Sequence, residues 1–143
     1  MTSPKFEPII RTQADLAGAW RTLMGPWGFG RPSVWVMGVV DDRPFPRLTE
    51  IAEAEEPPGA EEMGGFVKLL RRLAEDLGER ARFGFLRSRP GSGAVTDDDR
   101  RWAAALYAAA REAQVLCETV HLATHGDVRP LPLDELGNTE RSA

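Results

Sequence analysis

The sequence predicts a single α/β domain, in which a mixed sheet of about four to five strands packs with three helices. Its 143 residues are the usual length of one domain. Three segments carry apolar residues at helical spacing, and short runs rich in β-branched residues lie between them. We expect residues 9–136 to form the domain, residues 1–8 an N-terminal arm, and residues 137–143 a disordered tail.

Composition and charge are typical of a globular protein. Hydrophobic residues make up 42% and charged residues 28% of the chain. The formal net charge of −4 provides no basic field, so neither nucleic acid nor a membrane is expected as a partner. The single cysteine, Cys117, excludes an internal disulfide, and no apolar run approaches the ~20 residues of a membrane helix. With no signal-like start, these features predict a cytoplasmic protein.

The first helix is predicted to begin near residue 12. Thr12 and Asp15 have the spacing of a capping box, in which each side chain satisfies a free backbone amide of the first turn. Gly25 and Pro26 end the helix. The apolar residues of one face are Leu16, Ala19, Trp20, Leu23 and Met24. This face must pack against the rest of the domain.

A hairpin is expected next. Residues 34–40 read VWVMGVV, a nearly continuous apolar run typical of a strand covered on both faces, and we place this strand at the centre of the sheet. Two aspartates at 41–42 begin a turn, after which residues 45–51 return as an antiparallel partner. Pro44 and Pro46 have no backbone N–H, so the returning strand is predicted to lie at an edge.

The rest of the chain alternates helices and strands. An acidic connection at residues 52–62 leads to a helix whose apolar residues recur every three or four positions and which ends at Gly78. Residues 82–86 predict a short strand, and residues 96–114 a third helix. The segment 115–124 alternates polar and apolar residues, as a half-buried strand does, and 128–131 adds a short edge strand.

The junction between the third strand and the third helix carries the main candidate site. Arg87, Ser88 and Arg89 precede a glycine-rich loop, and helix N-termini attract anions. The loop matches neither a phosphate-binding loop with its lysine nor a dinucleotide-binding pattern. The aspartates at 97–99 also compensate the helix dipole.

Two interpretations of this junction follow. In the first, which we favour, Arg87, Arg89, Arg100 or Arg101 pair with the aspartates. In the second, the loop at residues 87–99 binds an anion or small molecule, or acts as a hydrolase-like enzyme. The site residues would then be Arg87, Ser88, Arg89, Asp99 and His121.

Metal binding and nucleophilic catalysis have less support. Cys117, His121, His125 and Asp127 are all ligand types, but residues four apart in a strand lie roughly 13 Å from one another. We therefore expect no metal and no cofactor, and surface positions for the histidines. Cys117 has no cationic neighbour that would activate it, and we expect it to be a packing residue.

The motif SRPGSGAVTDDDRRW, which follows a strand and opens a long helix, resembles the RadC-like form of the JAMM/MPN fold. In that family a HNHPSG stretch and a later SxxD supply two histidines and an aspartate to a zinc ion. Residues 96–99 match the SxxD start, and Pro90 and Gly91 match the loop. Aligning on Asp99 puts Leu86 and Ser88 at the histidine positions, whereas aligning on Pro90 puts Arg87 and Arg89 there. The chain is also similar to small proteins of high-GC bacteria, which implies no activity.

The resemblance implies zinc-dependent hydrolysis of peptide or isopeptide bonds, with Glu50 or Glu53 in the place of the general base. A catalytic zinc needs three protein ligands, which neither register supplies. The expected function is therefore that of a non-catalytic protein-interaction or regulatory module, which binds a protein partner or forms a homodimer. Aromatic residues that could anchor such a partner, if they are not part of the core, are Trp27, Phe29 and Trp35.

Overall fold

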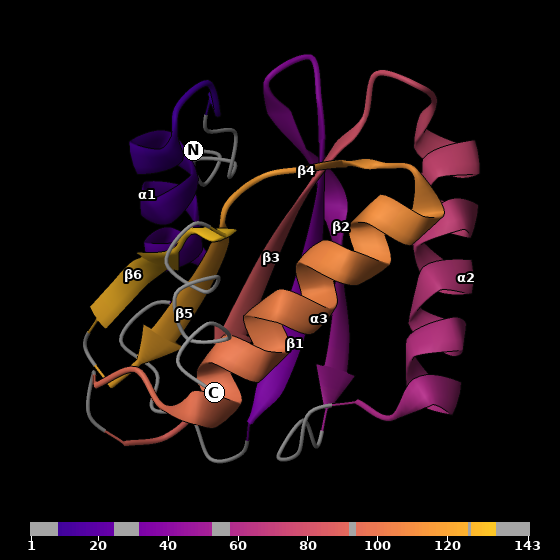
Figure 1. Ribbon diagram of the computed structural model, residues 1–143. Helices are drawn as coiled ribbons and strands as arrows, with labels where there is room; N and C mark the ends of the chain where they lie inside the picture. The colour runs from indigo at the N-terminus through magenta and orange to yellow at the C-terminus, as the bar shows by residue number, and fades with distance from the viewer. Residues whose placement is uncertain (1–8, 25–31, 53–57, 92–93, 126, 134–143) are drawn as a thin grey trace.

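The structure of the protein is a computed structural model, which describes residues 9–24, 32–52, 58–91, 94–125 and 127–133 (Figure 1). Its elements are α1 (Gln13–Met24), β1 (Ser33–Val40), β2 (Arg43–Ala52), α2 (Ala60–Leu77), β3 (Arg82–Ser88), α3 (Asp97–Ala113), β4 (Leu116–Cys117), β5 (Val120–Thr124) and β6 (Asp127–Leu131). The predicted class is confirmed, because three helices pack with one mixed sheet. The expected arm at 1–8 and tail at 137–143 lie outside the described residues.

The central strand of the sheet is β3. The strand order is β2-β1-β3-β5-β6, and the short β4 pairs with the start of β3. β3 is antiparallel to β1 and parallel to β5, and α3 lies in the connection between the two parallel strands. The prediction that β1 is the central strand was wrong, because β1 lies next to the centre, between β2 and β3. Arg82 and Arg87 flank the apolar residues of β3 and leave a run of only four residues, which hides the central position of this strand in the sequence.

Helices cover both faces of this sheet. α2 and α3 lie on one face, where Leu70 and Leu106 join Phe83 and Phe85 in the main core. α1 lies on the other face, where Trp20 packs in a second cluster. Because strand residues point alternately to the two faces, the even-numbered residues of β1 face α2 and α3, and its odd-numbered residues face α1.

The β1–β2 hairpin forms as predicted, with β2 at the edge of the sheet. Asp41 and Asp42 have φ values of 52° and 63°, and two successive positive φ angles define the type I′ turn that matches the twist of a hairpin. The pairing then becomes irregular, since Val39 pairs with Pro44 but Met37 pairs with Leu48. Three β2 residues, 45–47, therefore stand opposite Gly38 alone, which widens the hairpin at this point.

The last part of the sheet differs from the sequence expectation. The segment 115–124 forms two strands, β4 and β5, so the described sheet has six strands rather than four to five. All five residues of β5 are buried, whereas a half-buried strand was expected. The reason is tertiary: β3 and β6 flank β5, and each of its faces belongs to a core cluster.

The predicted starts of α1 and α3 and the predicted end of α2 are confirmed, whereas Gly25 and Pro26, expected to end the first helix, lie outside the described residues. The Asp15 amide donates to Thr12 Oγ1, and the Thr12 amide donates to the Asp15 carboxylate, both at 3.1 Å. Thr96 and Asp99 form the same reciprocal pair at the start of α3. Gly78 ends α2 with a φ of 93°, a value that favours glycine. Among the described helices, none combines the length and apolar character needed to cross a membrane.

Candidate functional site

Arg87, Arg89 and Asp99 meet between the end of β3 and the first turn of α3. Arg87 Nε donates to Asp99 Oδ1 at 2.8 Å. Arg89 donates through Nε and Nη2 to both oxygens of the same carboxylate, at 2.8 to 3.1 Å. The Thr96 amide adds a hydrogen bond at 2.9 Å. The carboxylate is fully buried and the Arg87 side chain is 3% exposed, so this cluster is part of the protein interior.

The surroundings of Asp99 keep it ionised. Burial would raise the pKa of its carboxyl, but hydrogen bonds from Arg89, from the Thr96 amide and from Arg87 outweigh burial and lower the pKa to about 2. The hydrogen bond to Asp99 raises the pKa of Arg89 in turn. Asp99 is therefore an anion throughout the physiological range, so it has no proton to donate as a general acid, and its low pKa makes it a weak general base.

The two arginines also hold the surrounding structure. The Arg87 guanidinium lies 5.7 Å from the centre of the Trp102 ring, a cation–π contact. Arg89 Nη2 donates to the Ala94 carbonyl at 2.7 Å, and Nη1 donates to the Pro90 carbonyl at 3.1 Å. These contacts join the strand, the loop and the helix. The interpretation that arginines pair with the aspartates is confirmed, and the pairs include Arg100 with Asp97 and Arg101 with Asp98.

Ser88 and His121 lie on the other face of the sheet. Ser88 follows Arg87 in β3, so it points toward the α1 side, where Trp35 Nε1 donates to Ser88 Oγ at 2.9 Å. His121 pairs with Leu86 of the α1-side cluster. The sheet thus separates Ser88 and His121 from the Arg87–Asp99 pair. The structure does not bring the five residues of the anion-site hypothesis to one place.

His121 corrects an expectation, because it is fully buried rather than on the surface. Its Nδ1 lies 3.0 Å from the Thr119 carbonyl oxygen, which makes Nδ1 the protonated nitrogen of a neutral ring. Burial, with a smaller effect of Arg21, lowers the pKa of His121 to about 4. Nε2 is buried without a hydrogen-bond partner in the described structure. A histidine in this state is neutral at pH 7 and cannot serve as a cation there.

The other candidate ligands and nucleophiles are dispersed. Burial raises the pKa of the Cys117 thiol to about 12, which suppresses the reactive thiolate. His125 is exposed, and Asp127 forms an ion pair with Arg129 at 3.1 Å. Within the described ranges no three His, Cys, Asp or Glu side chains gather as a metal site would require. Trp27 and Phe29 lie outside those ranges, and the Trp35 indole is already bonded to Ser88.

The positions implied by the JAMM/MPN resemblance can be located in the structure. Arg87 and Arg89, which take the histidine positions when the chain is aligned on Pro90, both contact Asp99. In the other register Leu86 and Ser88 face α1, away from Asp99. Guanidinium groups have no lone pair to offer a metal, so these residues do not fit a zinc ion.

The carboxylates at the general-base position do not complete such a centre either. Glu50 Oε2 accepts a hydrogen bond from Ser33 Oγ at 2.9 Å. Glu53 lies outside the described residues. A carboxylate activates water in this chemistry only beside a metal ion, and the residues at the ligand positions cannot hold one.

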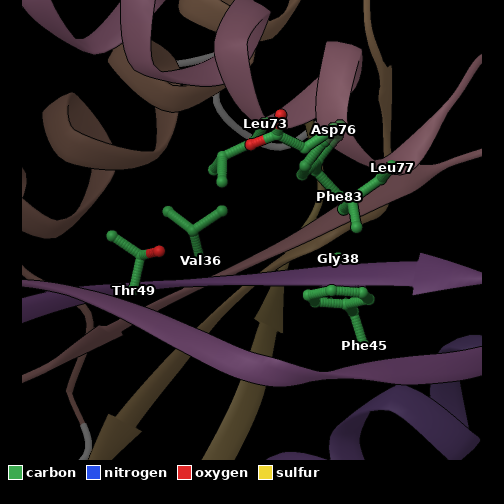
Figure 2. Close-up of a pocket in the computed structure, with 8 residues that line it drawn as sticks. All are labelled: Val36, Gly38, Phe45, Thr49, Leu73, Asp76, Leu77 and Phe83. Carbon is green, nitrogen blue, oxygen red and sulfur yellow. The ribbon is translucent and has the colours of Figure 1, made fainter.

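A cavity of about 380 Å³ lies between the sheet and the C-terminal half of α2. Its volume falls within the ~300–1,000 Å³ of ligand pockets. In Figure 2, Val36 and Thr49 rise from the strands toward the helix. We call this space the β2–α2 cavity; it is lined by Val36, Gly38, Phe45, Thr49, Leu73, Asp76, Leu77 and Phe83.

Two backbone features create the β2–α2 cavity. The irregular pairing of β2 places residues 45–47 opposite Gly38 and widens the hairpin beneath α2. Gly38 has no side chain, and a Cβ at this position would overlap Leu77 Cδ1. Sequence reasoning missed this site. The available signals were the glycine inside the apolar run of β1 and the two prolines of β2.

Comparisons with known proteins add no family to this description. No family model matches the chain, and no curated protein and no solved structure matches it. The function must therefore be inferred from the geometry and chemistry of the chain itself.

Proposed function

We propose that the chain is a cytoplasmic, non-catalytic protein-interaction module that binds its partner at the β2–α2 cavity. The observation that carries the proposal is an apolar cavity beside an edge strand. Five of its lining residues are apolar side chains from the sheet and α2, and Phe45 at its side is 42% exposed. Filling such a cavity with one apolar anchor would bury surface on both partners, which is the usual energetic centre of an interface.

The distribution of reactive groups supports binding over catalysis. Asp99 is ion-paired with two arginines, Cys117 is held as a thiol, and His121 is buried and neutral. Of the residues that line the cavity, Asp76 alone carries an ionisable side chain. One carboxylate without a base, nucleophile or metal beside it is a recognition group rather than a catalytic set.

The Arg87–Asp99–Arg89 cluster gives a second proposal, that the fold is a degenerate JAMM/MPN relative. It is supported by the convergence of the two histidine-equivalent positions and the aspartate. In this proposal the buried ion cluster stands where relatives hold zinc. Changing both arginines to histidine would be expected to create stoichiometric zinc binding, measured by elemental analysis. A folded double variant that binds no more zinc than the Arg87→His single variant would contradict the proposal.

The interaction proposal is tested with peptides selected from a random display library against the intact protein. Their affinities are then measured by fluorescence anisotropy for the native chain and for Gly38→Ala. The added Cβ pushes the flexible end of Leu77 into the cavity, so we expect binding to weaken at least tenfold. Gly84→Ala is the matched control, because its Cβ would contact Leu16 at 3.2 Å on the other face of the sheet.

Two results would contradict the interaction proposal. One is equal peptide affinity in the native chain, Gly38→Ala and Gly84→Ala, which would place binding elsewhere. The other is a selection that enriches no peptide at all. Circular dichroism on each variant shows whether the fold is retained, so that loss of binding is not mistaken for unfolding.

A further inference from the structure

We infer that the partner is an extended peptide segment that adds a strand to the second half of β2. This segment would place an apolar side chain in the β2–α2 cavity and a lysine or arginine beside Asp76. The inference rests on the proposed function and specifies the form of the bound partner. Three independent observations carry it: the open side of β2, the face on which the cavity lies, and the charge of Asp76.

The hairpin turn shows which backbone groups of β2 face the open edge. In a two-residue type I′ hairpin the flanking residues, Val40 and Arg43, direct their N–H and C=O groups toward each other. Backbone direction alternates along a strand, so the backbone polar groups of the even-numbered residues from Pro44 onward point outward. At the irregular pairing, three β2 residues stand opposite one β1 residue, so β2 has two extra residues there. Because two is an even number, the even-numbered residues of β2 still point their backbone groups outward beyond this point.

The open edge therefore has two different halves. Pro44 and Pro46 face outward and have no N–H, so no strand can pair continuously with the first half of β2. Leu48, Glu50 and Ala52 each direct a backbone N–H and C=O toward the open edge. No strand of the described sheet pairs with β2 on this side. Prolines usually protect an edge from unwanted pairing. Here they leave free a segment long enough for a short peptide strand.

The cavity lies beside this free segment, on a face that an added strand would reach. Thr49 and Ile51 pair with Val36 and Val34, so they face α2, and Thr49 lines the cavity. In an added strand, every second side chain would point to the same face. One of these side chains would lie next to Thr49 and enter the space between Phe45 and Leu73. Main-chain hydrogen bonds with a pocket for alternate side chains are the recurring mode of strand addition.

The Asp76 carboxylate indicates which charged residue the peptide should carry. Asp76 lies on the rim from α2, and within the described residues it has neither an ion-pair nor a hydrogen-bond partner. An unpaired carboxylate beside an apolar space favours a cation on the partner. We therefore expect selected peptides to share an apolar residue with a lysine or arginine one or two positions away.

Amide hydrogen exchange by NMR tests the strand addition. With a selected peptide bound, the amides of Leu48, Glu50 and Ala52 should exchange at least tenfold more slowly, because they acquire carbonyl partners. N-methylation of alternate peptide residues should weaken binding at least tenfold, while methylation of the residues between them should have little effect. Asp76→Asn should weaken binding and reduce its salt dependence, whereas Glu75→Gln, at the neighbouring position, should change neither.

The outcomes separate this inference from the proposed function. If Gly38→Ala abolishes binding but the three amides stay unprotected, the cavity is the binding site and strand addition is wrong. If the amides are already protected without peptide and light scattering shows a dimer, β2 pairs with a second copy and the peptide partner is wrong. If the amides are protected in a monomer without peptide, a segment of the chain itself occupies the edge, which also overturns the inference.

Discussion

The junction at Asp99 and the β2–α2 cavity at Asp76 place the same chemical group in opposite situations. At the junction, a fully buried carboxylate accepts hydrogen bonds from two guanidinium groups and a backbone amide. At the cavity, an exposed carboxylate stands beside apolar side chains with no partner in the described structure. Polar groups whose hydrogen bonds are all made within the protein stabilise the fold, whereas unpaired polar groups beside an open apolar surface are available to a ligand. The junction at Asp99, which carries the most conspicuous motif of the sequence, therefore stabilises the fold, whereas the cavity at Asp76 is available for binding.

The largest effect is expected at the junction. Asp99→Asn should lower the free energy of unfolding by about 3–5 kcal/mol, because it leaves two largely buried arginines without their anion. Denaturant unfolding measures this change. Asp97→Asn is the control, since Asp97 is exposed and pairs with the half-buried Arg100, so we expect a change within about 0.5 kcal/mol. Equal effects of the two substitutions would mean that the buried cluster has no special structural role.

The next effect is a pH dependence caused by His121. Its pKa is about 4 in the folded protein and 6.5 in the unfolded chain, so the unfolded chain takes up a proton first as the pH falls. Stability should therefore decrease by about 3 kcal/mol between pH 6.5 and pH 4. His121→Leu should remove this slope, and the exposed His125→Gln should retain it. Asp99, whose pKa is lowered from 3.8 to about 2, stabilises the folded protein above pH 3.8, and this contribution is lost mainly as the pH falls from 3.8 to 2, below the His121 window.

A smaller effect is expected at the helix cap of the junction. Thr96→Ala removes one half of the capping box while Asp99 keeps both arginines. The free energy of unfolding should fall by about 1 kcal/mol, as at other N-caps. Thr12→Ala makes the same change at α1 and serves as the comparison. A loss at Thr96 as large as that of Asp99→Asn would indicate that the cap, not the ion cluster, holds the junction together.

The smallest effect is expected for anions. Phosphate or phosphorylated metabolites should leave the melting temperature unchanged within error, because both junction arginines already bind Asp99. Thermal unfolding in rising phosphate, with matched sodium chloride as the ionic-strength control, measures this. A phosphate-specific increase that disappears in Arg89→Ala would restore the anion-binding interpretation of residues 87–99.

Local signals in the sequence were sufficient for much of the fold. The Thr12–Asp15 and Thr96–Asp99 pairs act within one helical turn, so their spacing predicted the starts of α1 and α3. Pro44 and Pro46 predicted the edge position of β2 for an equally local reason, the missing N–H. The pairing of the junction arginines with aspartates was also predictable, because charge and proximity along the chain suffice.

The remaining features depend on contacts between distant segments. The burial of β5 and His121 follows from the strands and helices around them, which the alternation of residues 115–124 does not reveal. The cavity depends on a shift of pairing between β1 and β2 and on the approach of Leu77 to Gly38. Gly38 and Leu77 are far apart in the chain, so no local pattern could indicate that they meet.

Methyl-resolved NMR during titration with a selected peptide tests the contrast between the two regions most directly. We expect large shift changes at Val36, Leu73 and Leu77, which line the cavity. We expect none at Val95, next to the Thr96 cap, and none at Leu16, which α1 packs against the other face of the sheet. Changes concentrated at Val95 with the cavity methyls unaffected would contradict the account, because they would assign binding to the junction and leave the cavity without a role.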